Sequence, residues 1–417
     1  MSKQLIIILF VIVLVVAGGT YWFLSSPTAT TPVTIPTGTN TGSNTFPIGG
    51  DRSVTPRTGD NTTGTPNGND IRTGNGFLAN NKTNSKFQEL SSEPVAGSIA
   101  IERGKSIIVR FIEKATGRVK EIIPGQSEAS RIANTTVPKV AIALFDPSGS
   151  KIALNTLKDP FNEIVTVLAS IEYSTSTTDT VGTLKGVSIP ERVGMMAISP
   201  DGKELFTLLR ETTGGTRGVL QGMDGKNRRE LFKSPLSEWL VSWPTKDTVL
   251  FSTKPSAGVL GYLYTVSPTT GAMNRLIGNV MGMTAKMSPD GEYLLVTTAD
   301  KRDTRSYVYK ISNQETNALP LKTISDKCAW ARTGDLSLYC AVPSNSVNYS
   351  NMPDSWYQGE TTFTDSFWRI NAKTLATTHL GDPEQMTDAD NLALDKNDKI
   401  LTFTNKNTGR LWGLKLD

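Results

Sequence analysis

The chain has 417 residues and a nearly balanced charge, with 43 Lys and Arg against 39 Asp and Glu and a formal net charge of +4. Such a mildly basic, mixed composition lacks the concentrated positive charge that neutralises phosphates, so we expect no nucleic-acid partner. The chain contains a single histidine, His379. Because general-base and metal chemistry most often use imidazole, this count argues against a hydrolase or a metalloenzyme.

Residues 5–24 form an uncharged, mostly apolar run, and Lys3 is the only charge before it. About 20 helical residues span roughly 30 Å, the thickness of a bilayer's hydrocarbon core. The aromatic residues at 21–23 lie where an interfacial belt is expected, and the positive-inside rule places the N-terminus in the cytoplasm. We therefore predict a single-pass transmembrane anchor in the cytoplasmic membrane, with the rest of the chain outside the cytoplasm. A cleaved signal peptide with its apolar core at 5–16 is the alternative.

Residues 25–96 are predicted to be a linker. Ser, Thr, Gly, Asn and Pro dominate the stretch up to residue 76, and its few charges balance. Such a composition buries too little apolar surface to offset the entropy of ordering, so a disordered tether is expected. The stretch at 77–93 is more mixed, which leaves open that it folds onto the domain that follows.

From about residue 97 onward, a short turn motif recurs between apolar runs. Ser199-Pro-Asp-Gly returns as Ser288-Pro-Asp-Gly, and each copy precedes an apolar run. With the weaker copies included, the positions aligned with the proline are Pro147, Pro200, Pro244, Pro289, Arg332 and Lys396. The intervals between these positions are 53, 44, 45, 43 and 64 residues. A period of about 44 residues with two insertions is typical of four-stranded propeller blades.

The chemistry of the motif fits this interpretation. Proline presets φ at the first turn position, aspartate bonds the local backbone, and glycine supplies a positive φ. Each unit is expected to contain strand a, the turn, strand b and two outer strands. Six such turns and a block of similar shape at residues 106–122 predict an all-β propeller over residues 97–417. Seven blades are expected, with an N-terminal strand able to complete the last one, and six blades are the alternative.

The Ser-Pro-Asp-Gly repeats resemble those of TolB-like bacterial propellers, which are related to WD-repeat proteins. The resemblance is strong at residues 199 and 288 and loose elsewhere. The chain also looks like bacterial envelope proteins that carry such a propeller behind one N-terminal anchor. The resemblance implies a fold and no particular activity, so no functional residue is carried over from it. Asp201 and Asp290 are expected to form turns.

Two cysteines, Cys328 and Cys340, flank the turn near Gly334. If residues 326–330 and 336–341 pair as antiparallel strands about this turn, the two cysteines lie directly opposite each other. Opposite Cβ atoms can be close enough for a disulfide, and a position outside the cytoplasm permits oxidation. A disulfide is therefore predicted, and two small buried thiols are the alternative.

Motifs of nucleophilic, phosphate-binding or zinc chemistry are missing from the sequence, so we expect no catalytic, cofactor-binding or metal-ligating residues. His379 is expected at the surface. An acidic stretch lacks the spacing of an EF-hand loop and is interpreted as a solvated rim: Asp382, Glu384, Asp388, Asp390, Asp395 and Asp398. Carboxylate-based glycoside chemistry needs no histidine and is the enzymatic alternative.

The 64-residue interval contains a long insertion, from Pro343 to Phe363, inside one blade. Long loops in compact repeats often carry function. In a propeller, the loops between strands b and c and the connections entering strand a share one face, so we expect Trp356, Tyr357 and Phe363 to lie with Trp239 on one exposed rim. Exposed Trp and Tyr are favoured anchors for protein partners, and flat rings also suit sugars. The alternative is that Trp356 folds back into the channel or fixes the loop.

These observations predict a non-enzymatic binding or scaffold module for a protein or a cell-envelope polymer. A carbohydrate-active hydrolase that uses carboxylates and a structural subunit of a larger membrane complex are the alternatives.

Overall fold

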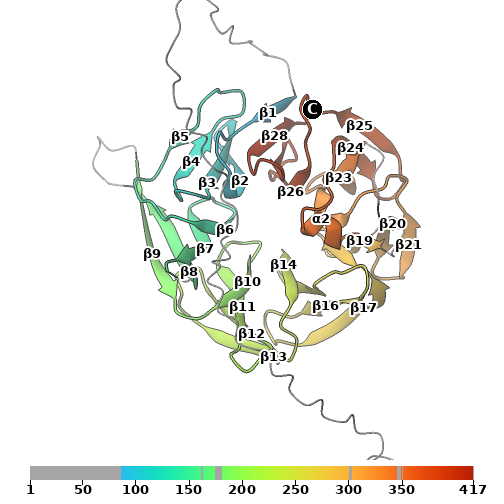
Figure 1. Cartoon of the computed structure of the whole chain (residues 1–417), viewed down its shortest axis with the longest axis horizontal. Helices are drawn as coiled ribbons and strands as arrows, with labels where there is room; N and C mark the ends of the chain where they lie inside the picture. The colour runs from blue at the N-terminus through green and yellow to red at the C-terminus, as the bar shows by residue number, and fades with distance from the viewer. Residues whose placement is uncertain are drawn as a thin grey trace, which may run out of the picture. The chain divides into compact units, whose positions relative to one another are not determined.

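The computed structural model describes residues 86–160, 163–173, 181–299, 303–344, 349 and 351–416. The strands in these ranges form seven four-stranded antiparallel sheets arranged as blades in a ring around a common axis (Figure 1). The prediction of a propeller with seven blades is confirmed, and the six-bladed alternative is wrong.

In blades 1 to 6 the four strands follow one another along the chain, from strand a nearest the axis to strand d at the outer circumference (Figure 1). Blade 1 contains β2 (Val95–Arg103), β3 (Ser106–Glu113), β4 (Val119–Ile122) and β5 (Ser130–Arg131). Blade 2 contains β6 (Val140–Phe145), β7 (Lys151–Lys158), β8 (Glu163–Glu172) and β9 (Thr183–Ile189). Blade 3 contains β10 (Val193–Ile198), β11 (Glu204–Arg210), β12 (Thr216–Gly222) and β13 (Arg229–Ser234).

The next three blades repeat this order. Blade 4 contains β14 (Trp239–Thr245), β15 (Thr248–Thr253), β16 (Leu260–Val266) and β17 (Met273–Met281). Blade 5 contains β18 (Thr284–Met287), β19 (Tyr293–Ala299), β20 (Thr304–Lys310) and β21 (Glu315–Ala318). Blade 6 contains β22 (Cys328–Trp330), β23 (Ser337–Pro343), β24 (Asp365–Asn371) and β25 (Thr377–Gly381). A short 3-10 helix, η1 (Ser325–Lys327), replaces the start of the strand that was expected from residue 326.

Blade 7 closes the ring with strands from both ends of the propeller. It contains β26 (Ala389–Leu394), β27 (Ile400–Asn405), β28 (Leu411–Lys415) and, as its outer strand, β1 (Phe87–Glu89). Phe87 pairs with Leu414, and its ring lies 5.2 Å from the ring of Phe367 in blade 6. The N-terminal strand thus completes the last blade, and the propeller begins at Phe87 and not at residue 97.

The repeated turns have the predicted chemistry. In the turn of blade 3, the backbone N–H of Gly202 donates to the carbonyl of Ser199 at 2.8 Å, and Gly202 has φ of +72°. The hydroxyl of Ser199 donates to Asp201 at 2.7 Å, and the same arrangement recurs from Ser288 in blade 5. Asp201 therefore forms a turn, as expected.

Strand b is largely buried in every blade. In β11, for example, every residue between the two terminal ones is buried, whereas most of the outer strand β9 is exposed. Both faces of strand b pack against neighbouring blades, so its sequence is a continuous apolar run without alternation. The core is accordingly a series of apolar clusters between adjacent blades.

The predicted anchor at 5–24 and most of the predicted linker at 25–96 lie outside the described residues. Within the described part of the chain, no helix has the length and apolar character needed to span a membrane.

Candidate functional site

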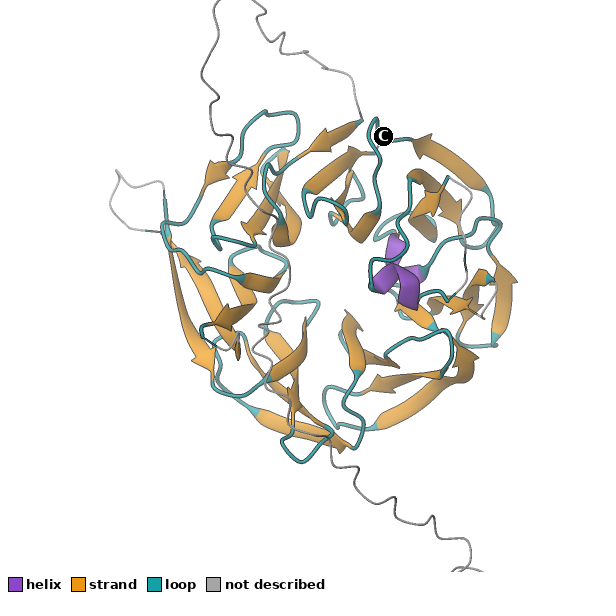
Figure 2. Cartoon of the chain, in the orientation of Figure 1, coloured by secondary structure: helices purple, strands orange, loops and turns teal. Residues whose placement is uncertain are grey.

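The insertion of blade 6 contains a short helix on the inner side of the ring (Figure 1). It leaves the sheet after β23, forms α2 (Asp354–Tyr357) and returns at β24. Pro353 precedes the helix, and Gly359, with φ of +80°, turns the chain away after it. Figure 2 shows α2 beside the inner strands of blade 6. We call this side of the ring, where strands b end and strands a begin, the α2 face; the opposite side, with the turns between strands a and b, is the turn face.

Most of the predicted aromatic rim is buried, so the expectation that all four side chains are exposed is wrong. Trp356 and Phe363 are each 1% exposed and stack with ring centroids 6.4 Å apart. Trp239 is 5% exposed and packs edge-on against Phe251. Only Tyr357, at 39%, is exposed. The alternative that Trp356 folds back and fixes the loop is the one that the structure adopts.

A buried ion cluster holds this loop in place. Lys327, at the end of η1, has no exposed surface, and its Nζ lies 2.7 Å from Asp365 Oδ2 and 2.6 Å from Asp388 Oδ1. Nζ also donates to the carbonyl of Ala389 at 2.8 Å. All three donor positions of the ammonium group therefore have oxygen partners, as a buried charge requires. The Lys327 Nζ also lies 5.3 Å from the ring centroid of Trp356, which adds a cation–π contact.

Asp388 connects the ion cluster to the insertion. The indole N–H of Trp356 donates to both of its oxygens at 3.0 and 3.1 Å, and the backbone N–H of Phe363 donates at 3.3 Å. From the other side, the Lys406 ammonium donates to the carbonyl of Trp356 and lies 4.2 Å from its ring centroid. The loop is thus fixed by charged groups of η1 and of blade 7.

The cluster is electrostatically unbalanced, with two carboxylates against one ammonium. Burial raises the pKa of Asp365 to about 6, although Lys327 and the backbone N–H of Ala389 favour the charged form. Burial also lowers the pKa of Lys406. A buried acid with such a pKa takes up a proton in the mildly acidic range.

A second group of polar residues lies beside α2. The hydroxyl of Tyr357 donates to Asp326 Oδ2 at 2.6 Å. Although the residue as a whole is 39% exposed, desolvation of its hydroxyl end and the Asp326 carboxylate raise the pKa of Tyr357. Burial, and to a lesser extent Asp326, raises the pKa of Asp390. Burial lowers the pKa of Lys286, whereas the negative charges of Asp326 and Asp390 act to raise it. These residues come from the starts of blades 5, 6 and 7 and place two interacting carboxylates near one lysine.

The acidic stretch is only in part the solvated rim that was expected: Asp382 and Glu384 are exposed, but the other four residues are buried or half-buried. Asp388 and Asp395 are each 1% exposed, and Asp395 accepts the backbone N–H of Ile400 in the turn of blade 7. Asp398 accepts the backbone N–H of Arg332 and so joins two neighbouring turns. Asp395 and Asp398 thus satisfy backbone donors of the turns. Among the described residues, no group of three His, Cys, Asp or Glu side chains has the geometry to hold a metal.

His379 and the two cysteines lie where the sequence placed them. The ring of His379 is exposed in the outer strand of blade 6, with Nε2 3.0 Å from Asp382 Oδ1. Cys328 and Cys340 are directly opposite in the pairing of β22 with β23, and a disulfide joins them.

Sequence reasoning missed Lys327 and Asp365. Lys327 is followed 61 positions later by Asp388, its partner in the fold. A lysine in a polar turn carries no local sign of burial, because the groups that neutralise it are distant in the sequence. The only available signal was Trp356 itself, whose indole needs a buried acceptor once the ring is covered.

Exposed apolar side chains occur on α2 and in the part of blade 4 whose loop is bonded to α2. Val259 is 57% exposed, Leu260 43%, Met281 43% and Tyr357 39%. Leu260 pairs with Met281 at the edge where β16 begins and β17 ends. The backbone N–H of Ala257 donates to Asp354 Oδ2 at 2.6 Å, which ties this loop of blade 4 to α2. Val259, Leu260, Met281 and Tyr357 are named the apolar patch below.

Comparison with known proteins identifies the fold. No protein family and no curated protein matches the sequence. Among solved structures, an oligogalacturonate lyase from Vibrio parahaemolyticus is 10% identical, with 78% of this chain and 90% of that chain covered and a TM-score of 0.51. The tricorn protease is 9% identical, with 80% and 34% covered and a TM-score of 0.52. TolB from Acinetobacter baumannii is 13% identical, with 77% and 79% covered and a TM-score of 0.41. At these identities the likeness concerns the fold alone: the chain is a seven-bladed β-propeller.

Proposed function

We propose that this protein is a membrane-anchored, extracytoplasmic propeller that binds a partner protein on its α2 face and does not catalyse a reaction. The anchor rests on the apolar run at 5–24, and the predicted linker gives the propeller reach from the membrane. The binding face rests on the apolar patch.

The apolar patch is the observation that carries the proposal. Scattered exposed apolar residues are normal, but neighbouring ones are typical of an interaction surface. Val259, Leu260 and Met281 are neighbours in blade 4, and the bond from Ala257 to Asp354 connects their loop to the helix that carries Tyr357. The insertion is held by Lys327 and Asp388, so the position of Tyr357 is fixed before a partner arrives. Little ordering entropy is then lost on binding. An aliphatic patch with one tyrosine fits a protein surface better than a sugar, which prefers several exposed aromatic rings.

Site-specific photo-crosslinking in membranes tests this proposal with the full-length chain. A photoreactive residue replaces Val259 in the apolar patch or, as a control, Val187, which is 50% exposed on the outer strand of blade 2. We expect a discrete protein adduct from position 259 and none from position 187. Met281→Glu should remove the adduct at 259, because a charge there opposes apolar contact.

The outcome also separates the alternatives. Equal adducts at both positions, or none at 259, would refute binding at this face. An adduct that glycosidases and not proteases remove would assign the face to an envelope polymer. If replacing residues 5–24 with an unrelated apolar span abolishes the adduct, the anchor itself contacts a larger membrane complex.

The interacting carboxylates Asp326 and Asp390 support a second candidate, a hydrolase that acts on carbohydrate. Two carboxylates, one with a raised pKa, are the minimal groups for glycoside cleavage. This candidate predicts release of reducing ends from envelope polysaccharide, and loss of that release in Asp390→Asn and Asp326→Asn. Polysaccharide that stays intact with the wild-type protein would remove this candidate.

A further inference from the structure

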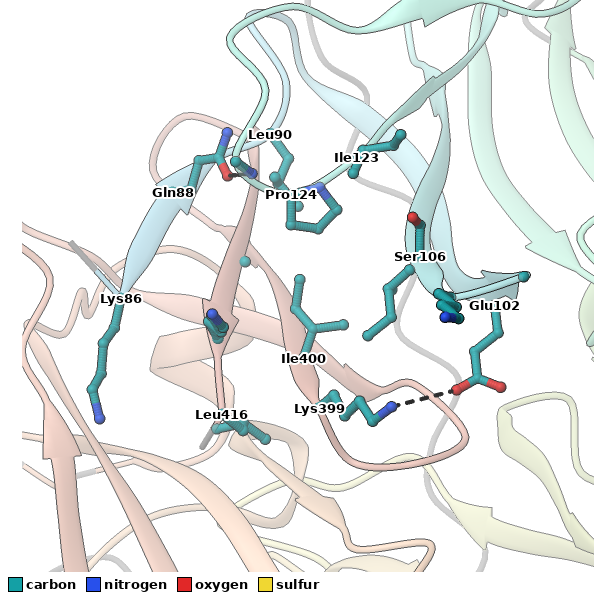
Figure 3. Close-up of a pocket in the computed structure, with 16 residues that line it drawn as sticks. Lys86, Gln88, Leu90, Glu102, Ser106, Ile123, Pro124, Lys399, Ile400 and Leu416 are labelled. Carbon is teal, nitrogen blue, oxygen red and sulfur yellow. Dashed lines mark hydrogen bonds and ion pairs between the residues drawn. The ribbon is translucent and has the colours of Figure 1, made fainter. Parts of the chain in front are cut away.

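A cavity of about 860 Å³ lies at the seam between blade 1 and blade 7. Its walls come from the ends of β2 and β3 on one side and from β1, β27 and β28 on the other (Figure 3). These chain ends belong to the turn face, so the cavity and the apolar patch lie at opposite ends of the strands. The cavity lies where the ring closes, so both ends of the propeller contribute to its lining, from Lys86 to Leu416.

The described lining of this seam cavity combines buried aliphatic residues with lysines whose side chains are exposed. Figure 3 shows Leu90, Pro124 and Ile400 around one space. Four lysines line the same cavity and have exposed side chains: Lys86, Lys105, Lys399 and Lys415. Neither an aromatic residue nor an arginine occurs among the lining residues that the structure describes.

Positive charge exceeds negative charge in the seam cavity. Glu102 is the only acidic residue of the described lining, and it already pairs with Lys396 at 3.3 Å and with Lys399 at 4.0 Å. In the part of the chain that the structure describes, Lys105 and Lys415 form no ion pair. A site with surplus ammonium groups around an apolar floor is complementary to a ligand that is both acidic and apolar.

The chemistry of the walls narrows the class of ligand. Sugars and nucleobases stack on aromatic rings, and anions that accept two parallel hydrogen bonds favour arginine. The described lining contains no aromatic residue and no arginine, so these ligands fit it poorly. Lysines act as point charges that suit carboxylates in variable positions. Aliphatic walls suit leucine-like side chains. The volume is within the range of sites that enclose small molecules or short peptide segments.

We propose that the seam cavity binds an acidic peptide segment that carries aliphatic side chains. The carboxylates of the segment contact the lysines at the edge, and its aliphatic side chains enter the cavity against Leu90 and Ile400. This site is independent of the α2 face, so the propeller can hold two partners at once, one at each end of its strands.

Fluorescence anisotropy tests the proposal with the full-length chain in nanodiscs of zwitterionic lipid. The probe is a labelled hexapeptide of alternating glutamate and leucine. Two matched peptides replace glutamate with glutamine or leucine with serine. Saturable binding is expected for the first peptide only, and added salt should weaken it.

Two double variants locate the binding site. Lys105→Glu with Lys415→Glu reverses two charges in the cavity. Lys226→Glu with Lys246→Glu makes the same change in net charge at exposed positions of blades 3 and 4. We expect the cavity variant to bind about tenfold more weakly and the control variant to bind like wild type, since each reversal turns an attraction of ion-pair size into a repulsion. Ile123→Ser, at an exposed apolar position of the cavity, should weaken binding without changing its salt dependence.

Each other outcome overturns the proposal. Equal loss in the two double variants means that the peptide responds to net charge and not to the cavity. Unchanged affinity in the cavity variant places the peptide elsewhere. Binding to vesicles that contain an anionic phospholipid, with no binding of the glutamate–leucine peptide, assigns the lysines to a membrane surface.

Discussion

Replacing Lys327 with methionine should destabilise the propeller more than any other single charge removal among its described ion pairs. The side chain has no exposed surface and holds Asp365 and Asp388, which are 2% and 1% exposed. Methionine fills the space of the aliphatic stem, so packing is largely kept and the change is mainly electrostatic.

The size of the effect follows from the charge that remains. Without the ammonium group, Asp388 keeps its bonds from Trp356 and from the backbone of Phe363 but has no cation within the buried cluster. Removing one partner of a buried ion pair typically costs about 3–5 kcal/mol, because the other charge is left uncompensated. We expect Lys327→Met to lower the free energy of unfolding by this amount at neutral pH. Lys185→Met, which breaks an exposed pair with Glu172, should cost less than about 1 kcal/mol.

The assay is urea denaturation followed by tryptophan fluorescence, with hydrogen exchange of the α2 amides as a local measure. The triple variant Lys327→Met, Asp365→Asn, Asp388→Asn removes all three charges and should recover most of the lost stability. If Lys327→Met costs no more than Lys185→Met, or if the triple variant is no more stable than the single one, then the buried charges do not determine how the insertion is held.

Three further predictions concern the same region and the closure of the ring. Because burial raises the pKa of Asp365 from 3.8 to about 6, the folded state keeps a proton that the unfolded state releases. The stability that Asp365 contributes is therefore complete below about pH 4 and is lost as the pH rises to about 6. Over this range, the free energy of unfolding of the wild type should fall by about 3 kcal/mol relative to Asp365→Asn, and a constant difference would contradict the raised pKa. Replacing both Cys328 and Cys340 with alanine should lower the free energy of unfolding by about 3 kcal/mol, since the disulfide closes a loop with a separation of 12 residues. Thiol labelling of the unreduced, denatured wild type should find no free thiol, and two labelled thiols would exclude the disulfide. Phe87→Ala removes ring contacts to blades 6 and 7 and should lower the free energy of unfolding by about 2–4 kcal/mol, whereas Phe87→Leu should lower it less. Equal stability of Phe87→Ala and the wild type would show that β1 does not close the ring.

The repeat, the turns and the cysteine pairing could be predicted from the sequence, because each depends on residues close together in the chain. The turn at Ser199-Pro-Asp-Gly is a local structure, and its hydrogen bonds join residues within five positions of one another. The pairing of Cys328 with Cys340 follows from one hairpin, since a turn fixes which residues face each other. The blade period then determines the architecture, because a single blade cannot bury its faces alone.

Only the tertiary structure decided where the insertion lies and which charges are buried. Trp356 and Phe363 were expected to be exposed as anchors for a partner on a long loop, but Lys327 and Asp388 are the buried groups against which they fold inward. The lining of the seam cavity likewise combines residues from the two ends of the propeller, from Lys86 to Leu416. Such features depend on groups that meet only when the ring closes, and no local pattern of residues records their distances.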